Sequence, residues 1–173
     1  VDYVAAVPND TAAHVYLERC SPLARVTNGV RGDSPPLWQE NYSLGPETVD
    51  TAHRALLADM NALARAINVG ALELATPLLA QIESSAILVF NIEERMMKDE
   101  EYPFLDLHNR QHRRFFEYFD ELRSEILRGD EDRVYLGFRI KRFLPGWLVN
   151  HILSADRHYG HHKNSRAEVT RRL

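Results

Sequence analysis

The chain is 173 residues long, with 45% hydrophobic residues, 27% charged residues and a formal net charge of −4 at pH 7. This length suits one domain with a sizeable core, and the charge gives no electrostatic case for binding nucleic acid. One cysteine, Cys20, allows no internal disulfide, and without a signal-peptide pattern we expect a cytoplasmic protein. The central apolar runs are far shorter than the roughly 20 residues of a membrane span, so we expect no transmembrane segment.

Residues 1–45 show no sustained helical periodicity. Prolines and glycines interrupt this region repeatedly, among them Pro35-Pro36 and Gly45. We therefore predict an irregular N-terminal arm that packs on a helical domain. The tripeptide Arg31-Gly32-Asp33 within it spells an adhesion motif, but we expect an ordinary surface turn there.

From Pro46 onward, apolar residues recur at the spacings of amphipathic helices. Four such stripes follow one another with short connections, so we predict an all-α fold, an antiparallel up-down four-helix bundle over residues 46–160. The basic stretch 161–173 is expected to be a fraying end or the start of a linker. The predicted inward faces are Val49, His53, Leu56, Met60, Leu63 and Ile67; Leu79, Ile82, Ala86, Val89, Glu93 and Met96; Leu105, His108, His112, Phe115, Phe119, Leu122 and Ile126; and Val134, Phe138, Leu144, Leu148, His151 and Ala155.

Glycine and proline mark the predicted helix boundaries. Gly70 and Gly129 each follow an apolar stripe, where glycine commonly ends a helix. Thr76 is the expected N-cap of the second helix, with Pro77 at its first helical position. Pro145 lies inside the fourth stripe and removes one backbone donor, which predicts a local kink in that helix.

Side chains that bind metals lie on these apolar stripes. His108 and His112 are four residues apart, so both imidazoles stand on one face of a helix. His53 and His151 lie on two other stripes. Glu93 is a carboxylate among hydrophobic residues, and a buried carboxylate needs a cation or hydrogen bonds. Imidazoles and carboxylates suit iron, zinc, manganese or copper, and helical bundles place such ions between facing helices.

Asp156 joins this candidate set less directly. It comes five residues after His151, which is a rotation of about 140° on a regular helix, so helical spacing alone does not select it. It reaches a site only at the mouth of the bundle or through a local distortion of the helix; otherwise it is a surface aspartate. If Glu93 and Asp156 both bridge, together with a hydroxide, they largely offset the charge of two divalent ions. This charge balance favours a dinuclear centre with neutral histidines.

Four segments of the chain form an ordered pattern: residues 38–53, with a tryptophan, a tyrosine, a glycine and an aspartate before His53; residues 93–97; the HxxxH segment 108–115; and residues 147–156. In this order and at this spacing they resemble the motifs of bacterial hemerythrins. The similarity covers about residues 38–160. It implies two non-haem iron ions with an oxo or hydroxo bridge, and dioxygen or another small diatomic as their ligand. The implied metal ligands are His53 for one iron; His108, His112 and His151 for the other; and Glu93 and Asp156 as bridges.

One position departs from the family pattern. The family has a histidine four residues before the bridging glutamate, where this chain has Val89, which cannot bind metal. The resemblance therefore implies that the second iron has one protein imidazole and a position open to water. Leu148 resembles the residue that closes the dioxygen pocket in the family. Water in this pocket is expected to shorten the lifetime of bound dioxygen and to favour rapid oxidation of the iron ions to the diferric form.

From this resemblance we expect a domain that reacts with dioxygen and serves as an oxygen or redox sensor, with no enzymatic activity of its own. Such domains also occur fused to signalling modules such as diguanylate cyclases, and this chain resembles an excised sensory domain with its output module on the C-terminal side. The alternatives are an oxygen carrier or storage protein, a diiron oxidase or peroxidase, and a metal-free interaction module. Paired ExxH motifs and HExxH are absent from the sequence, which disfavours ferritin-like oxidases and zinc proteases.

Overall fold

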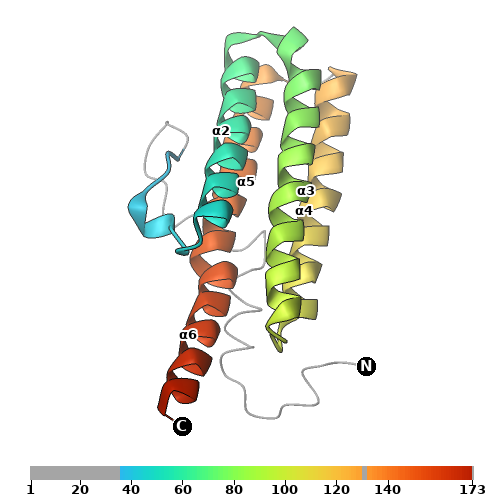
Figure 1. The fold of residues 1–173 in the computed structure, drawn as a ribbon. Coiled ribbons are helices and arrows are strands. Elements are labelled where there is room, and N and C mark those ends of the chain that lie inside the picture. Colours follow the sequence, from blue (N-terminus) through green and yellow to red (C-terminus); the bar gives the residue numbers. More distant parts are fainter. Residues whose placement is uncertain (1–35, 130–131, 173) are drawn as a thin grey trace.

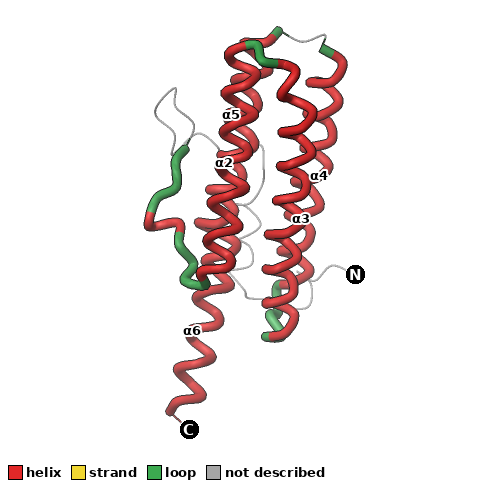
Figure 2. Tube along the Cα trace, turned by 45° about the horizontal axis from the view of Figure 1, so that its top comes forward, coloured by secondary structure: helices red, strands yellow, loops and turns green. Residues whose placement is uncertain are grey.

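A computed structural model describes residues 36–129 and 132–172 of the chain. Four long helices, each running opposite to its chain neighbour, form the bundle (Figure 1): α2 (Glu47–Val69), α3 (Ala75–Asp99), α4 (Leu105–Arg128) and α5 (Arg133–His151). Short 3-10 helices, η2 (Glu40–Tyr42) and η3 (Leu72–Leu74), precede α2 and α3, and α5 continues through a π-helical segment, η4 (Ile152–Asp156), into α6 (Arg157–Arg172). Figure 2 shows helices and loops and no strand in the described part of the chain. The predicted all-α four-helix bundle is confirmed.

Two helix ends follow from glycine as predicted, and one predicted helix start is wrong. Gly70 and Gly129 end α2 and α4 in the left-handed conformation, with φ of 77° and 71°, as predicted. The prediction of Thr76 as an N-cap is wrong, because α3 already begins at Ala75. Pro77 is tolerated in the first turn since the amides there have no partner within the helix.

The core confirms three of the four predicted faces almost completely. In the second and third helices only the terminal members, Met96 and Leu105, are half-buried rather than buried. The prediction for the start of the fourth helix is wrong, because Val134 and Phe138 are 79% and 58% exposed. Phe138 lies six residues before the buried Leu144, about 120° around the helix. The face that packs inward instead carries Leu136, Ile140, Phe143 and Trp147.

The end of the predicted N-terminal arm contacts the bundle. Residues 1–35, with the adhesion-type tripeptide and the cysteine, lie outside the described residues. Within residues 36–45, Tyr42 is buried in the main core cluster. The backbone N–H of Leu44 donates a hydrogen bond to Oδ1 of Asp50 at 2.9 Å. This bond attaches the segment to the first turn of α2.

The C-terminal stretch continues the last helix. Instead of ending near Gly160, α6 runs to Arg172 and extends past the end of the four-helix bundle (Figure 1). Lys163 Nζ donates a hydrogen bond to Glu100 at 2.6 Å, which ties α6 to the end of α3. α5 is helical through Pro145, and the kink expected there stays a prediction.

One stretch of the described chain, Leu72–Asp99, is long and apolar enough to cross a membrane by length and composition alone. The core helix of a soluble protein passes the same test, so this is weak evidence for a span. The stretch includes α3, whose inward face packs in the core and carries the buried Glu93. The expected absence of a transmembrane segment stays a prediction.

Candidate metal centre

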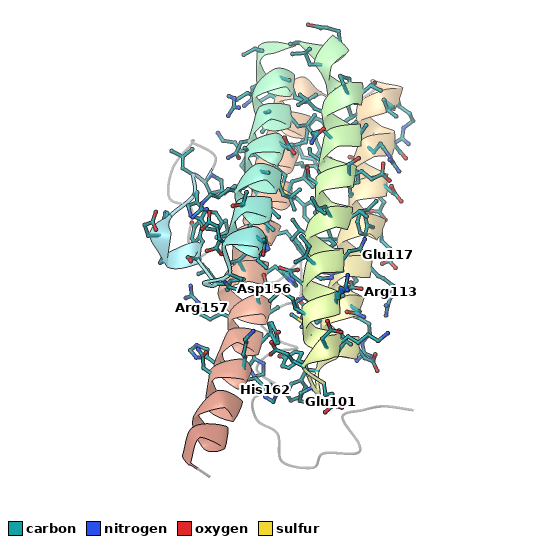
Figure 3. All side chains as sticks on the ribbon, in the orientation of Figure 1. Glu101, Arg113, Glu117, Asp156, Arg157 and His162 are labelled. Carbon is teal, nitrogen blue, oxygen red and sulfur yellow. The ribbon has the colours of Figure 1, made fainter. Side chains whose placement is uncertain are left out.

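All six predicted metal ligands lie together in one half of the bundle. They come from the N-terminal turns of α2 and α4, the C-terminal turns of α3 and α5, and the π-helical segment. Figure 3 places Asp156 near the lower end of the bundle, where the last helix continues into α6. Each of these residues is at most 3% exposed: His53, Glu93, His108, His112, His151 and Asp156.

Three histidines and Glu93 form the first group of facing ligand atoms. The Nε2 atoms of His112 and His151 are 3.1 Å apart. Oε2 of Glu93 lies 3.3 Å from Nε2 of His112 and 3.8 Å from Nε2 of His108. All four side chains offer one ligand atom within 4.8 Å of the others. We call Glu93, His108, His112 and His151 the three-histidine group.

A second group contains one imidazole and two carboxylates. Nε2 of His53 lies 2.9 Å from Oε1 of Glu93 and 3.7 Å from Oδ2 of Asp156. These three ligand atoms also lie within 4.8 Å of one another. We call His53, Glu93 and Asp156 the one-histidine group.

The two carboxylates connect the groups by using different oxygens for each. Glu93 directs Oε1 to His53 and Oε2 to His112, and Asp156 directs Oδ2 to His53 and Oδ1 to His151 at 3.2 Å. A carboxylate that bridges two metal ions presents its oxygens in this way. The arrangement therefore fits two adjacent ions that share Glu93 and Asp156.

The hydrogen bonding of these atoms also fits a pair of cations. Among the described residues, both oxygens of Glu93 and of Asp156, and Nε2 of His53 and of His108, are buried without a hydrogen bond. The 2.9 Å contact between His53 and Glu93 lacks the alignment of a hydrogen bond. Buried polar atoms normally have partners, and bound metal ions would provide them here.

Burial and the neighbouring charges of the site explain the shifted pKa values. Burial opposes protonation of His53 and His112, but nearby carboxylates, above all Glu93, raise the pKa of both imidazoles. Burial lowers the pKa of His108 to about 4, so this imidazole is neutral and ready to bind metal at pH 7. Burial also opposes ionisation of Glu93, but the surrounding histidines hold its pKa well below the usual range. Glu93 is therefore a carboxylate at neutral pH.

Comparison with known proteins agrees with this geometry. Residues 44–161 match the family model described as the hemerythrin HHE cation binding domain. The chain belongs to the hemerythrin family. It is 25% identical over 123 residues to the bacteriohemerythrins of Stenotrophomonas maltophilia (strain R551-3) and of Pseudomonas paraeruginosa (strain DSM 24068 / PA7), which is 71% of this chain and 78% of each relative. Hemerythrins bind non-haem diiron, and the ligand set described above suits such a centre.

The π-helical segment explains how Asp156 reaches the hemerythrin site. On a regular α-helix the fifth residue after His151 points about 140° away from it. In η4 (Ile152–Asp156) the wider turn accommodates one additional residue, so Asp156 lies close to His151. Asp156 therefore reaches the other candidate ligands through a local distortion of the helix, which is one of the alternatives that we consider from the sequence.

Four residues around the ligands were not expected from the sequence. Nδ1 of His112 is hydrogen-bonded to Oε1 of Glu94 at 2.8 Å, and Nδ1 of His151 to Oε1 of Gln111 at 2.9 Å. The ring of Phe90 stacks on His112 and the ring of Trp147 stacks on His151. Glu94 directly follows the candidate ligand Glu93, and Gln111 directly precedes His112. This proximity in sequence could have indicated both residues.

Val89 occupies the position where the hemerythrin pattern has a histidine. It is 1% exposed, and Leu148 is fully buried, in the same core cluster. No described side chain takes the place of the missing imidazole: Ser85 donates a hydrogen bond to Asp59, and Asn91 is exposed. The one-histidine group thus offers fewer protein ligands than the three-histidine group.

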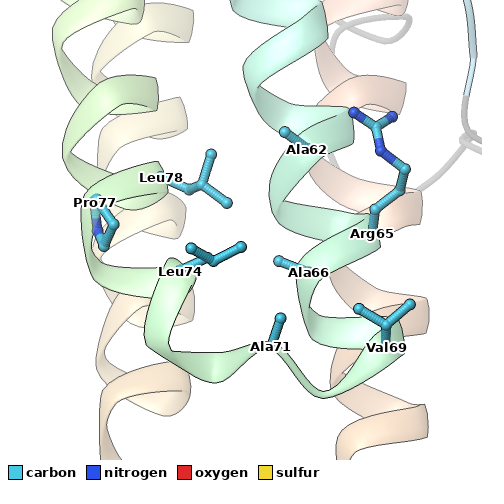
Figure 4. A pocket seen from close by; sticks show the side chains of 8 residues that line it. All are labelled: Ala62, Arg65, Ala66, Val69, Ala71, Leu74, Pro77 and Leu78. Carbon is cyan, nitrogen blue, oxygen red and sulfur yellow. The ribbon is translucent and has the colours of Figure 1, made fainter.

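A separate hollow of about 460 Å³ lies between the C-terminal end of α2 and the start of α3 (Figure 4). Its lining is almost entirely apolar, with Leu74 and Leu78 on one side and Arg65 on the other. It contains none of the six candidate ligands and lies at the other end of the bundle from them.

Proposed function

We propose that this hemerythrin domain holds two non-haem iron ions with an oxo or hydroxo bridge, reacts with dioxygen, and serves as an oxygen or redox sensor. The observation that supports the metal pair is the division of the oxygens of Glu93 and Asp156 between two groups of imidazoles. When bound, the two iron ions would be the redox-active groups that dioxygen oxidises. The residues of the chain determine how readily that change occurs.

The unequal ligand groups support a sensor rather than a carrier. His108, His112 and His151 would hold one ion, while the other would have His53 as its one imidazole. Val89 gives no ligand on that side, so a position there is free for water or another exogenous ligand. A carrier must hold dioxygen reversibly without passing to the diferric form. Water beside the second ion opposes this, and we therefore propose rapid oxidation.

Buried apolar residues lie within one helical turn of the candidate ligands Glu93 and His151, which suits a small uncharged molecule. Val89, Leu148 and Ile152 are buried in one hydrophobic cluster. A buried apolar lining offers no hydrogen bonds to a charged or larger polar ligand, so such a ligand would lose its hydration without compensation, whereas a single water is compensated by the ion that binds it. Dioxygen or another small diatomic fits these surroundings.

The connection from α5 to α6 supports signalling. Asp156 is the last residue of the π-helical segment, and the same helix continues from it into α6. A change in how Asp156 is held would therefore act directly on α6, which extends past the bundle (Figure 1). We propose that this helix passes the state of the centre to an output module in a cytoplasmic parent protein.

Replacing Val89 tests the role assigned to this position. Val89→His restores the family's histidine four residues before Glu93, and we expect reduced, iron-loaded protein to oxidise more slowly in air than the wild type. The rate is measured as the growth of diferric absorption after mixing with air-saturated buffer. Leu88→His on the exposed side of the same helix is the matched control and should oxidise at the wild-type rate. An unchanged rate in Val89→His would contradict the role assigned to this position.

A further inference from the structure

Two of the candidate iron ligands are hydrogen-bonded through their second ring nitrogen, each to a side chain of a neighbouring helix. Glu94 on α3 accepts from Nδ1 of His112 on α4 at 2.8 Å, and Gln111 on α4 accepts from Nδ1 of His151 on α5 at 2.9 Å. Nδ1 of His53 and of His108 are buried with no hydrogen bond among the described residues. An acceptor at Nδ1 fixes the tautomer that leaves Nε2 free to bind metal.

The two acceptors differ in charge and in exposure. Glu94 is a carboxylate whose side chain is 33% exposed, whereas Gln111 is a neutral amide that is 8% exposed as a residue. Glu94 follows Glu93 directly, and a step of about 100° around α3 moves its side chain from the core to the edge of α4. The three-histidine group therefore has one imidazole with a charged partner and one with a neutral partner.

Aromatic stacking also holds both rings in place. Phe90 stacks on His112 with ring centroids 3.8 Å apart and an interplanar angle of 6°. Trp147 stacks on His151 at 4.7 Å and 11°. Because each ring has a flat aromatic neighbour and one hydrogen-bond acceptor, the chemical difference between the two imidazoles is the negative charge of Glu94.

We propose that Glu94 is a positioning residue that, through His112, lowers the reduction potential of the ion in the three-histidine group. A carboxylate that accepts a hydrogen bond from a metal-bound imidazole makes that imidazole a stronger donor, which favours the more highly charged ion. This inference rests on the proposed function, because it needs iron at the site. It adds to that function a residue outside the ligand set that favours the oxidised state.

Exchanging the charges of the two acceptors tests this inference in the full chain loaded with iron. Glu94→Gln keeps an acceptor of the same shape and removes the charge. We expect about a tenfold shift of the reduction equilibrium toward the ferrous form, a rise in midpoint potential of about 59 mV for a one-electron couple. Gln111→Glu adds a charge beside His151 and should lower the potential by a similar amount. The double variant should return close to the wild-type potential.

A control and a second measurement separate charge from loss of structure. Glu117 is exposed on the outer side of α4 (Figure 3), so Glu117→Gln changes the net charge equally and should leave the potential unchanged. Zinc has no redox chemistry, and its affinity should fall about tenfold in Glu94→Gln and stay unchanged in Glu117→Gln.

The outcomes distinguish this inference from the proposed function. Wild-type protein that binds no iron would contradict the proposed function itself. Iron-loaded Glu94→Gln with an unchanged potential would overturn the role of Glu94 and leave the diiron centre in place. A shift of Glu94→Gln and Gln111→Glu in the same direction would also overturn it, because it would indicate a purely structural effect. If Glu94→Gln loses its iron, the potential of Gln111→Glu and the zinc affinities decide.

Discussion

Glu93 and Asp156 each turn one oxygen toward His53 and the other toward the three-histidine group. A single ion in either group would leave buried nitrogen and oxygen ligand atoms of the other group without partners, and each such atom lowers the free energy of unfolding. Two ions provide partners for the ligand atoms of both groups. The effect of each ligand residue on metal binding can therefore be measured by replacing it.

Removing His53 should affect one ion more than the other. His53 is the one imidazole of its group, whereas the other group has three. We expect His53→Ala to lower the iron content from about two to about one per chain, measured by elemental analysis of the purified protein. His161→Ala removes an exposed histidine of α6 and should keep both ions. Two ions retained in His53→Ala would show that this imidazole is not a ligand.

Metal binding should release protons. Burial opposes protonation of His53 and His112, but Glu93 and its neighbours raise their pKa, so in the metal-free protein both imidazoles keep their protons to higher pH than usual. Metal binds neutral imidazole, so binding must expel these protons and the apparent affinity must rise with pH. Titrations with zinc at about pH 6, 7 and 8 measure this. Equal affinity at each pH, with no proton release, would contradict the assigned protonation.

Sequence reasoning selected six candidate ligands, which the structure brings together, and missed the hydrogen-bonding partners of two of them. Histidines and a glutamate on apolar stripes are conspicuous, because polar residues there need a reason. Glu94 and Gln111 lie at the edges of their stripes, where polar side chains are ordinary, so periodicity gives no signal for them. Their contacts depend on how neighbouring helices are rotated, which the periodicity of one helix does not contain.

At the scale of helices, the bundle could be predicted because each helix has a long apolar stripe and two of the helices end at a glycine. Gly70 and Gly129 adopt the left-handed conformation that ends a helix. The start of α5 was assigned the wrong face, since Val134 and Phe138 are apolar but exposed. For the stretch after Gly160 we expect a fraying end or the start of a linker; in the structure it continues α6, whose contact with Glu100 involves residues distant in sequence.

Shortening the π-helical segment tests why Asp156 reaches the site. A π-helical turn holds one residue more than an α-helical turn, so deleting Ser154 should convert η4 to a regular helix and leave Asp156 four residues after His151, on the same face. We expect this deletion to retain about two ions per chain. Deleting Leu153 as well should rotate Asp156 by about a further 100° and lower the metal content.

Metal content and circular dichroism distinguish the results of these deletions. A helical protein that loses its metal on deletion of Ser154 alone would contradict this interpretation, because it would show that the π-helical geometry itself is required. Deletion of Ser165, an exposed residue further along α6, controls for the shortened chain and should leave the metal content unchanged.

At the scale of the whole molecule, the two ends of the bundle differ. The candidate ligands gather at the end from which α6 extends (Figure 1 shows this helix), and an apolar hollow lies at the other end (Figure 4). The helix that carries His151 and Asp156 therefore also forms the part of the described chain that leaves the bundle. The candidate ligands His151 and Asp156 are therefore linked to α6, and to any partner of α6, through one continuous helix.

Iron content combined with absorption spectra tests the central claim most directly. The protein is analysed as isolated, after anaerobic reduction, and after renewed exposure to air. The account predicts about two irons per chain, one for each ligand group, and absorption of an oxo-bridged diferric centre that disappears on reduction and returns in air. A folded helical protein that binds no iron, or a single ion with no such absorption, would contradict it.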